Sequence, residues 1–424
     1  MNRITSALVV LFVCLVPISV SPLPLNSKWC DVVLVALAIA LGSRLWRGWR
    51  PTVLDWCILS YLAASALAIR PEYGLTFGMS ALTKQFAVVL VYIVFAAVAR
   101  ASGVALTVRA LVLTAVGLSV AGLGAAVLFL VTGWVVPWLG SPMPLPYVRN
   151  VFRLYGLTDS PEMFACFLTF AVALATAPIV AATPRSRLAT VFTIAVASLA
   201  TFAHSIAGGI LATSVAAGAD QRARPWPLWR RSLLATGLAA TLAANLALIV
   251  TVREVTFTGG HRTDIAAPQG VYGFQDTQGA STADVHLTYN WMSYFLLKRV
   301  AWDAFISAPW RGTGLGRFHE LTERAYQAGQ IHSPYRRIDP HSTLMGRLAE
   351  TGAIGGITLV ALWAAAFLTV RQLAGVAASR AVAVGLFGAF VGLAVNAINV
   401  DVMNFRFLWI GFGLLRGIAG PHKQ

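Results

Sequence analysis

Residues 108–133 read VRALVLTAVGLSVAGLGAAVLFLVTG, and Arg109 is the only charged side chain among them. A helix that crosses the hydrocarbon core of a bilayer needs about 20 mostly apolar residues, so this stretch is predicted to span a membrane. The rest of the chain is similar, because 58% of its 424 residues are hydrophobic and only 11% are charged. A soluble domain has roughly a quarter of its residues charged. The composition therefore excludes a cytosolic globular enzyme, a disordered chain and a secreted disulfide scaffold.

The same length rule, applied along the chain, predicts an all-α polytopic membrane protein with about twelve transmembrane helices. The expected spans are 4–22, 29–43, 54–69, 85–99, 108–133, 162–182, 188–203, 205–219, 232–252, 343–370, 381–398 and 404–419. The fold class thus follows from hydropathy alone.

The charges predict the orientation of these spans. The chain has 32 Lys and Arg against 16 Asp and Glu, a formal net charge of +16. Short cytoplasmic loops are enriched in Lys and Arg, which explains the excess without binding of nucleic acid. With the N-terminus in the cytoplasm, the most basic short connections share the cytoplasmic side, among them those that hold Arg44, Arg47, Arg50, Arg185, Arg187, Arg371 and Arg380. Both termini are therefore predicted to be cytoplasmic.

One extended polar region, residues 253–342, separates the membrane helices expected in 1–252 from those expected in 343–424. On this topology the region is a periplasmic loop domain. Long loops in compact proteins are commonly functional, so we expect the functional site there. Within it, Tyr289–Phe305 has helical apolar spacing with Trp and Tyr, which is typical of a helix at the membrane interface. Five of the seven histidines also lie in this region, namely His261, His286, His319, His332 and His341.

The run DPHSTLMGRLAETGAIGG, residues 339–356, leads into the predicted span 343–370. A Pro before a Ser/Thr cap and an apolar stretch is typical of a helix start, which places His341 at the periplasmic mouth of that helix. A histidine at a water–lipid boundary can take a proton from a hydroxyl nucleophile. It can also simply cap the helix or extend into the interface, and its position alone favours this simpler role.

Two other segments place arginines near predicted helix ends. Arg149 and Arg153 precede the sixth span, where two arginines beside a helix N-terminus suit a phosphate or pyrophosphate group. Between Arg299 and Arg317, the spacing of Gly312–Gly316 predicts a tight turn that brings basic side chains to a lipid phosphate. A headgroup-anchoring pair and an ordinary loop are the respective alternatives.

Taken together, these segments resemble the O-antigen ligase and polymerase family of bacterial inner membranes. The matching residues are Arg153-Leu-Tyr-Gly156 with Pro161; Arg299, Trp302 and Pro309 with the turn Gly312–Gly316; Pro340-His341 with Leu348, Glu350-Thr-Gly352 and Gly355; and Asp401 with Arg406 and Trp409. Two positions differ from the family pattern. The Asn after the histidine is Ser342 here, and the family's Ser-Arg-Gly pattern reads His204–Gly208, without its arginine.

The resemblance implies a GT-C-like fold and an active site at the periplasmic face of the inner membrane. It implies transfer of a glycan from undecaprenyl pyrophosphate, with no metal and no cofactor. An acceptor hydroxyl would attack the anomeric carbon and invert its configuration as the lipid pyrophosphate leaves. His341 would act as the base or orient the acceptor, and Asp401 would tune His341 or hold an arginine. The pyrophosphate would be bound by Arg153 and Arg299, with Arg149 or Arg317.

Several functions remain open at this point. A ligase would move the finished chain to lipid A–core, whereas a polymerase would extend the chain itself. The length of the protein, its span count and its single late loop favour the ligase. A protein-glycosylating member is not favoured, because the sequence shows no added soluble domain that would indicate one. A secondary transporter is the alternative from another class, but transporters carry ionisable residues near the bilayer midplane. Here the acidic residues Asp31, Asp55, Glu162 and Glu350 fall near predicted span ends.

Overall fold

The computed structural model is mostly helical. It describes residues 1–19, 28–73, 75–145, 148–177, 183–203, 205–206, 208–210, 212, 215, 292–331 and 338–420. Among these residues, three helices are long and apolar enough to cross a membrane: α4 (Leu75–Arg100), α5 (Val104–Thr132) and α12 (Thr343–Ala374). The prediction of a helical membrane protein is therefore confirmed.

Shorter helices also coincide with predicted spans. They are α1 (Arg3–Leu15), α2 (Trp29–Leu41), α3 (Val53–Leu67), α6 (Pro161–Ala175), α7 (Pro184–Leu199), α13 (Arg380–Asn396) and α14 (Arg406–Ala419). The predicted span 205–219 is described only in part, and 232–252 lies wholly outside the described residues. The count of twelve spans therefore stays a prediction.

Local sequence signals explain where several helices begin. Ser160 and Thr183 precede α6 and α7, which begin with Pro161 and Pro184. Each hydroxyl accepts a hydrogen bond of 3.2 Å from a backbone N–H of the first turn. Proline suits the first helical position because its missing N–H would have no partner there. Ser342 caps α12 in the same way, with a longer bond of 3.5 Å. The cap that the sequence predicts for this helix is therefore present.

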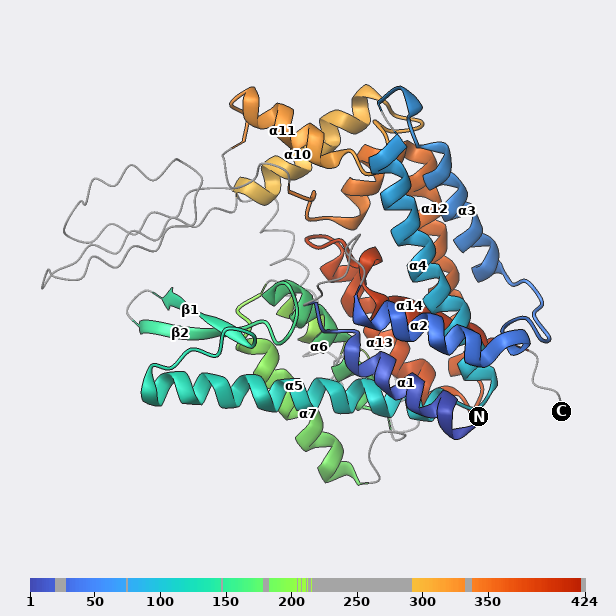
Figure 1. Ribbon diagram of the computed structural model, residues 1–424, viewed down its shortest axis with the longest axis vertical. Coiled ribbons are helices and arrows are strands. Elements are labelled where there is room, and N and C mark those ends of the chain that lie inside the picture. Colours follow the sequence, from blue (N-terminus) through green and yellow to red (C-terminus); the bar gives the residue numbers. More distant parts are fainter. Residues whose placement is uncertain are drawn as a thin grey trace, which may run out of the picture.

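The helices form two differently oriented groups (Figure 1). Helices α3, α4 and α12 run side by side, and α14 packs along α4. Helix α5 crosses below this group and packs on α1, α6 and α7. The first turns of α4 and α12 lie at the upper end of Figure 1, near α10 (Met292–Ser307) and α11 (Phe318–Gln327). The N-terminus lies at the lower right, away from α10 and α11.

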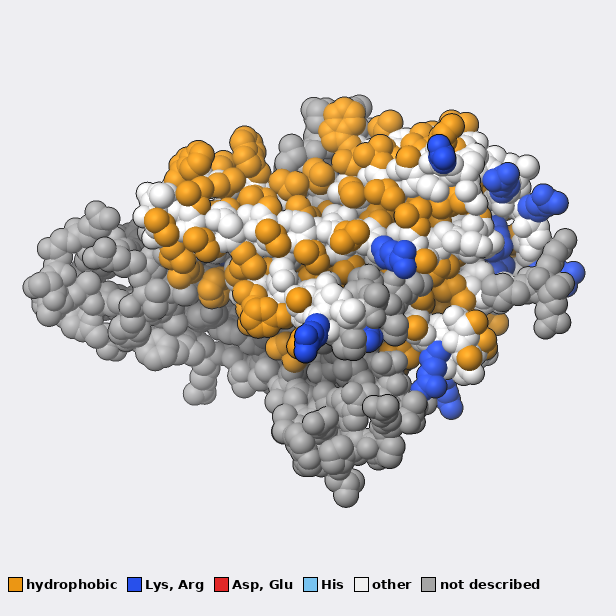
Figure 2. Space-filling view, turned by 90° about the horizontal axis from the view of Figure 1, so that it is seen from below, with side chains coloured by type: hydrophobic (Ala, Val, Ile, Leu, Met, Phe, Trp, Pro, Cys, Tyr) orange, Lys and Arg blue, Asp and Glu red, His pale blue; other side chains and the backbone are white. Residues whose placement is uncertain are grey.

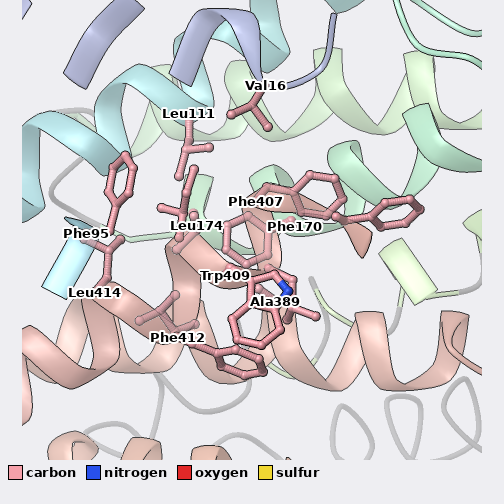
Figure 3. Close-up of a cluster of buried hydrophobic side chains, with 14 of the residues drawn as sticks. Val16, Phe95, Leu111, Phe170, Leu174, Ala389, Phe407, Trp409, Phe412 and Leu414 are labelled. Carbon is pink, nitrogen blue, oxygen red and sulfur yellow. The ribbon is translucent and has the colours of Figure 1, made fainter. Parts of the chain in front are cut away.

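A buried aromatic and aliphatic cluster joins α4, α5, α6, α13 and α14 (Figure 3). The ring centroids of Phe170 and Phe407 are 5.6 Å apart, and those of Trp409 and Phe412 are 5.7 Å apart. Tilted and edge-to-face pairs of this kind stabilise beyond the burial of their area. The indole N–H of Trp409 donates to the carbonyl of Met403 at 2.7 Å, which fixes the segment before α14 to this cluster.

Helix α12 is interrupted at Gly352, whose φ of 64° lies in the left-handed region. An interruption leaves backbone groups without helical partners, and the loop 309–314 supplies those partners. Two N–H groups of the loop donate to the carbonyls of Ala349 and Glu350 at 2.9 and 3.1 Å, and the N–H of Ala353 donates to a loop carbonyl at 2.7 Å. The glycine-rich turn is thereby bonded to α12 beside Glu350.

We expect Gly352→Ala to lower the free energy of unfolding by at least about 2 kcal/mol. The alanine would have to keep the left-handed φ of Gly352, and its Cβ would lie 2.4 Å from the backbone carbonyl of Trp310. Thermal unfolding of the purified protein in detergent measures the loss. Gly124→Ala on α5 is the matched control, because no atom lies within 4 Å of its added Cβ, and alanine favours the helix by up to about 1 kcal/mol. Equal stability of the two variants would contradict the packing of this loop on α12.

A two-stranded hairpin departs from the all-α prediction. Strand β1 (Gly140–Leu145) pairs antiparallel with β2 (Val148–Leu154), with Gly140 opposite Leu154. The prolines of β1 obscure a strand in the sequence, but proline is tolerated at the edge of a sheet. Leu154 packs against α5, where its side chain lies within 3.2 Å of a Cβ placed on Gly122. The hairpin is thus anchored on α5 rather than standing alone.

Large apolar side chains are exposed along α5. Leu113, Val120, Val127 and Leu130 are each more than half exposed, a pattern that would be costly in water but is expected of a helix that faces lipid. Figure 2 shows such a face, largely hydrophobic, with most of its Lys and Arg side chains toward the side where Figure 1 places the N-terminus. The surface of the described residues therefore agrees with a membrane-embedded protein.

Candidate functional site

A polar cavity of about 220 Å³ lies among the first turns of α4, α11 and α12 and the segment before α14. Its wall combines groups that are distant in sequence. The ionisable residues that line it are Lys84, His319, Asp339, Arg347, Glu350 and Asp401. Ionisable groups gathered in one concave site of a membrane protein mark a candidate functional site.

Arg347 is the most buried of these ionisable groups, with 6% of its surface exposed. Its guanidinium carbon lies 5.2 Å from the centre of the Tyr61 ring, in a cation–π contact. The carboxylates of Asp339, Glu350 and Asp401 all act electrostatically on it. Burial of an arginine is tolerated when opposite charges compensate it, so Arg347 depends on these acids and the acids depend on it.

Glu350 is held in place from the first turn of α11. Its Oε1 accepts a hydrogen bond of 3.2 Å from the backbone N–H of Phe318. A carboxylate is favoured at a helix N-terminus, where backbone N–H groups lack helical partners. The glycine-rich turn also bonds to the backbone of Glu350. The loop before α11 therefore fixes the main chain of this residue, and the first residue of α11 fixes its side chain.

Asp401 is the predicted site residue that lines the cavity. Its carboxylate accepts hydrogen bonds from the backbone N–H of Met403 (3.2 Å) and from the Asn404 side chain (2.8 Å). Burial raises the pKa of the Asp401 carboxyl above the usual aspartate value, although Arg347 acts in the opposite direction. The Thr343 hydroxyl donates to the carbonyl of Val400 at 2.9 Å and ties this segment to the start of α12.

Two other predicted residues lie beside the cavity. Arg317 follows a lining glycine, pairs with Glu320, and donates to the carbonyl of Thr313 at 3.3 Å. His341 lies between the lining residue Pro340 and the cap of α12, and its φ of 46° is in the left-handed region. A non-glycine residue in that region stores strain of about 1 kcal/mol or more. Such strain is more frequent at functional sites than elsewhere, which agrees with the prediction of His341 as a site residue.

The remaining predicted arginines lie elsewhere. Arg153 is on β2, where its Nε donates to the carbonyl of Thr201 at 2.9 Å and its guanidinium lies 3.8 Å from the carboxylate of Glu162. Arg299 is on α10 and is two-thirds exposed, with Asp303 4.0 Å away. The side chain of Arg149 lies outside the described residues. The structure therefore does not place Arg153 or Arg299 at the polar cavity.

The sequence did not single out several residues that line the cavity. Hydropathy began the fourth span at residue 85 and so left out the polar first turns of α4, which include Lys84. One signal was present, because Arg347 and Glu350 are three residues apart and share a helix face. Lys84 and His319 line the same cavity only because α4 and α11 pack near each other in the fold, and no local sequence pattern indicates this.

Among the residues that the structure describes, no group of three or more His, Cys, Asp and Glu side chains could hold a metal ion. The cavity can instead offer hydrogen-bond acceptors to hydroxyl groups, two cations to an anion, and groups that exchange protons. No known protein-family model matches the chain, and no curated protein is detectably similar to it.

Proposed function

We propose that the protein is an inverting glycosyltransferase of the O-antigen ligase type. Its donor is a glycan on undecaprenyl pyrophosphate, and its acceptor is the lipid A–core. The reaction takes place at the periplasmic face of the bacterial inner membrane, with both termini in the cytoplasm. The motifs around Arg153, Arg299, His341 and Asp401 support this proposal. The cytoplasmic N-terminus is supported by Figure 1, in which the N-terminus lies far from the first turns of α4 and α12.

The observation that carries the proposal is the polar cavity at the interrupted helix α12. A lipid pyrophosphate is already an activated leaving group, so the protein need only position the acceptor, stabilise negative charge and accept one proton. Carboxylates such as Glu350 and Asp401 can accept hydrogen bonds from sugar hydroxyls. Lys84 and Arg347 can stabilise the negative charge of the phosphates. The cavity therefore supplies each kind of group that this reaction needs.

A deletion strain tests the proposed function and separates it from its runner-up. We expect its lipopolysaccharide to lose every O-antigen band on a gel, because no chain would reach the lipid A–core. A repeat-unit polymerase would instead leave a core that carries one unit. An unchanged ladder would contradict both functions.

Complementation of that strain tests His341. We expect His341→Asn to fail to restore the bands, since asparagine tolerates a left-handed backbone but cannot take up a proton. The matched control is Arg380→Ala at the start of α13, which should restore them. Full activity of the His341 variant, with both proteins present at equal levels in the membrane, would remove His341 from the reaction.

A further inference from the structure

The strained backbone of His341 needs contacts that hold it in place. A non-glycine residue keeps a left-handed conformation only where the surrounding structure fixes it there, and the φ of His341 is 46°. On one side the preceding residue, Pro340, is buried against α12, so closely that a Cβ on Gly346 would lie 2.7 Å from the proline ring. The contacts on the other side involve the connection between α13 and α14.

Residues 397–402 of that connection, here called the clamp, bind the first residue of α12. The backbone N–H of Thr343 donates to the carbonyl of Ala397 at 2.9 Å. The Thr343 hydroxyl donates to the carbonyl of Val400 at 2.9 Å and accepts from the N–H of Val402 at 3.0 Å. The side chain that makes these contacts is buried, with 2% of the residue exposed. The helix start, two residues after the strained histidine, is therefore fixed to the clamp.

The clamp is held in turn from α10. The Nζ atom of Lys298 donates to Oδ1 of Asn399 at 2.8 Å, and each of these residues is 7% exposed. A lysine is rarely buried unless it has partners, and this partner belongs to the clamp. Asn399 also lies two residues before Asp401, which lines the polar cavity. Helix α10 thus supports the segment that carries Asp401 and binds the start of α12.

We propose that the clamp holds His341 in its working position beside the cavity, and that Thr343 and Lys298 are positioning residues for it. The inference rests on the proposed function. As the acceptor oxygen bonds to the anomeric carbon, its proton passes to the imidazole of His341. The pyrophosphate leaves with the electron pair of the bond that breaks. Misplacing a reacting group by about 1 Å can lower a rate about 100-fold, so a loosened clamp should slow this step.

Thr343→Val tests the contact between the clamp and α12. The substitution removes the hydroxyl but keeps the branched shape and the backbone bond. The assay is transfer by the purified full-length protein in proteoliposomes, with a lipid-pyrophosphate-linked glycan and lipid A–core as probes. We expect kcat to fall about 10- to 100-fold with little change in KM for the donor, because the hydroxyl acts on the position of His341. Thr343→Ser should restore most of the wild-type kcat, since serine keeps the hydroxyl.

Thr107→Val on α5 is the matched control for stability. The Thr107 side chain is fully buried, and its hydroxyl donates to the carbonyl of Gly103 within the same helix at 2.9 Å. Its loss should lower Tm to a similar extent as Thr343→Val and leave kcat at the wild-type value. A folded Thr343→Val protein with wild-type kcat would overturn the proposal, as would equal losses of kcat in the two variants.

A double-variant experiment tests the contact between α10 and the clamp. Lys298→Met and Asn399→Leu should each lower kcat by about 10-fold. The double variant should lose less than the product of the two single losses, because both substitutions remove the same hydrogen bond. Losses that multiply would contradict the role of this bond in holding the clamp.

The last comparison asks whether Thr343 acts through His341. In a His341→Asn background, Thr343→Val should leave the residual rate of transfer unchanged, since the effects of residues that act as a unit do not add. A further fall of about 10-fold would overturn the proposal. If the wild type transferred no glycan under any condition, the proposed function itself would fail. That outcome is distinct from an active wild type whose kcat is unaffected by Thr343→Val.

Discussion

Replacing Arg347 with methionine is expected to reduce glycan transfer by about 100-fold or more, as for the loss of a preorganised charge-stabilising group. The guanidinium is buried, stacks on Tyr61 and faces Asp339, Glu350 and Asp401. Without it, three carboxylates would line a cavity of about 220 Å³ with Lys84 as the one remaining cation among the described lining residues, so the net negative charge that the pyrophosphate meets would increase. Transfer in proteoliposomes measures the effect on rate.

The same substitution should lower the free energy of unfolding by about 1–3 kcal/mol, because it leaves the half-buried carboxylates of Glu350 and Asp401 without their buried cation. Arg371→Met is the matched control, since Arg371 is an exposed residue near the other end of the same helix. Arg347→Lys should fall between the two, because lysine keeps the charge but not the planar group that stacks on Tyr61. A fully active Arg347→Met protein would contradict the assignment of this cavity as the active site.

The parts of the fold that the sequence predicts are those that depend on local pattern. The apolar run 108–133 coincides closely with α5, and the Ser342 cap begins α12 where expected. The fourth span was predicted too short because its first turns carry Ser80 and Lys84, which lower hydropathy without ending the helix. Those polar turns line the cavity, so the same residues that hide the helix from a hydropathy scan form part of the site.

The candidate site was less predictable because its groups meet only through packing. Asp401 was predicted, and it does line the cavity. Arg153 was chosen as a phosphate ligand because it precedes a helix start, but its guanidinium donates to carbonyls at the end of α7. Sequence position identifies an arginine near the membrane surface, and it cannot tell whether a phosphate or a backbone carbonyl is its partner.

A second group of buried charges lies away from the cavity, at the last turns of α4 and α14 and the first turn of α3. Arg416 of α14 has 2% of its surface exposed, and its Nε donates to the Asp55 carboxylate at 2.8 Å. The hydroxyl of Tyr92 donates to the other oxygen of Asp55 at 2.6 Å. The ring of Trp49 has the guanidinium carbons of Arg100 and Arg416 each 4.9 Å from its centre. These contacts connect α3, α4 and α14.

Asp55→Asn is therefore expected to lower the free energy of unfolding by about 3–5 kcal/mol, because Arg416 would remain buried without a compensating charge. Thermal unfolding in detergent measures this loss. The double variant Asp55→Asn with Arg416→Met should lose less than the sum of the two single losses, since it removes both charges together. Asp303→Asn is the control, because Asp303 belongs to an exposed ion pair that contributes at most about 1 kcal/mol.

This prediction also separates stability from chemistry. Asp55 and Arg416 do not line the polar cavity, so folded Asp55→Asn protein should retain the wild-type kcat at temperatures below its unfolding transition. Arg347→Met should lose transfer even where it is fully folded, because its charge faces the reacting groups. If Asp55→Asn instead lost transfer in parallel with Arg347→Met at low temperature, the two ends of the helices would be coupled through α4 and α14. The assignment of Asp55 and Arg416 to stability alone would then be wrong.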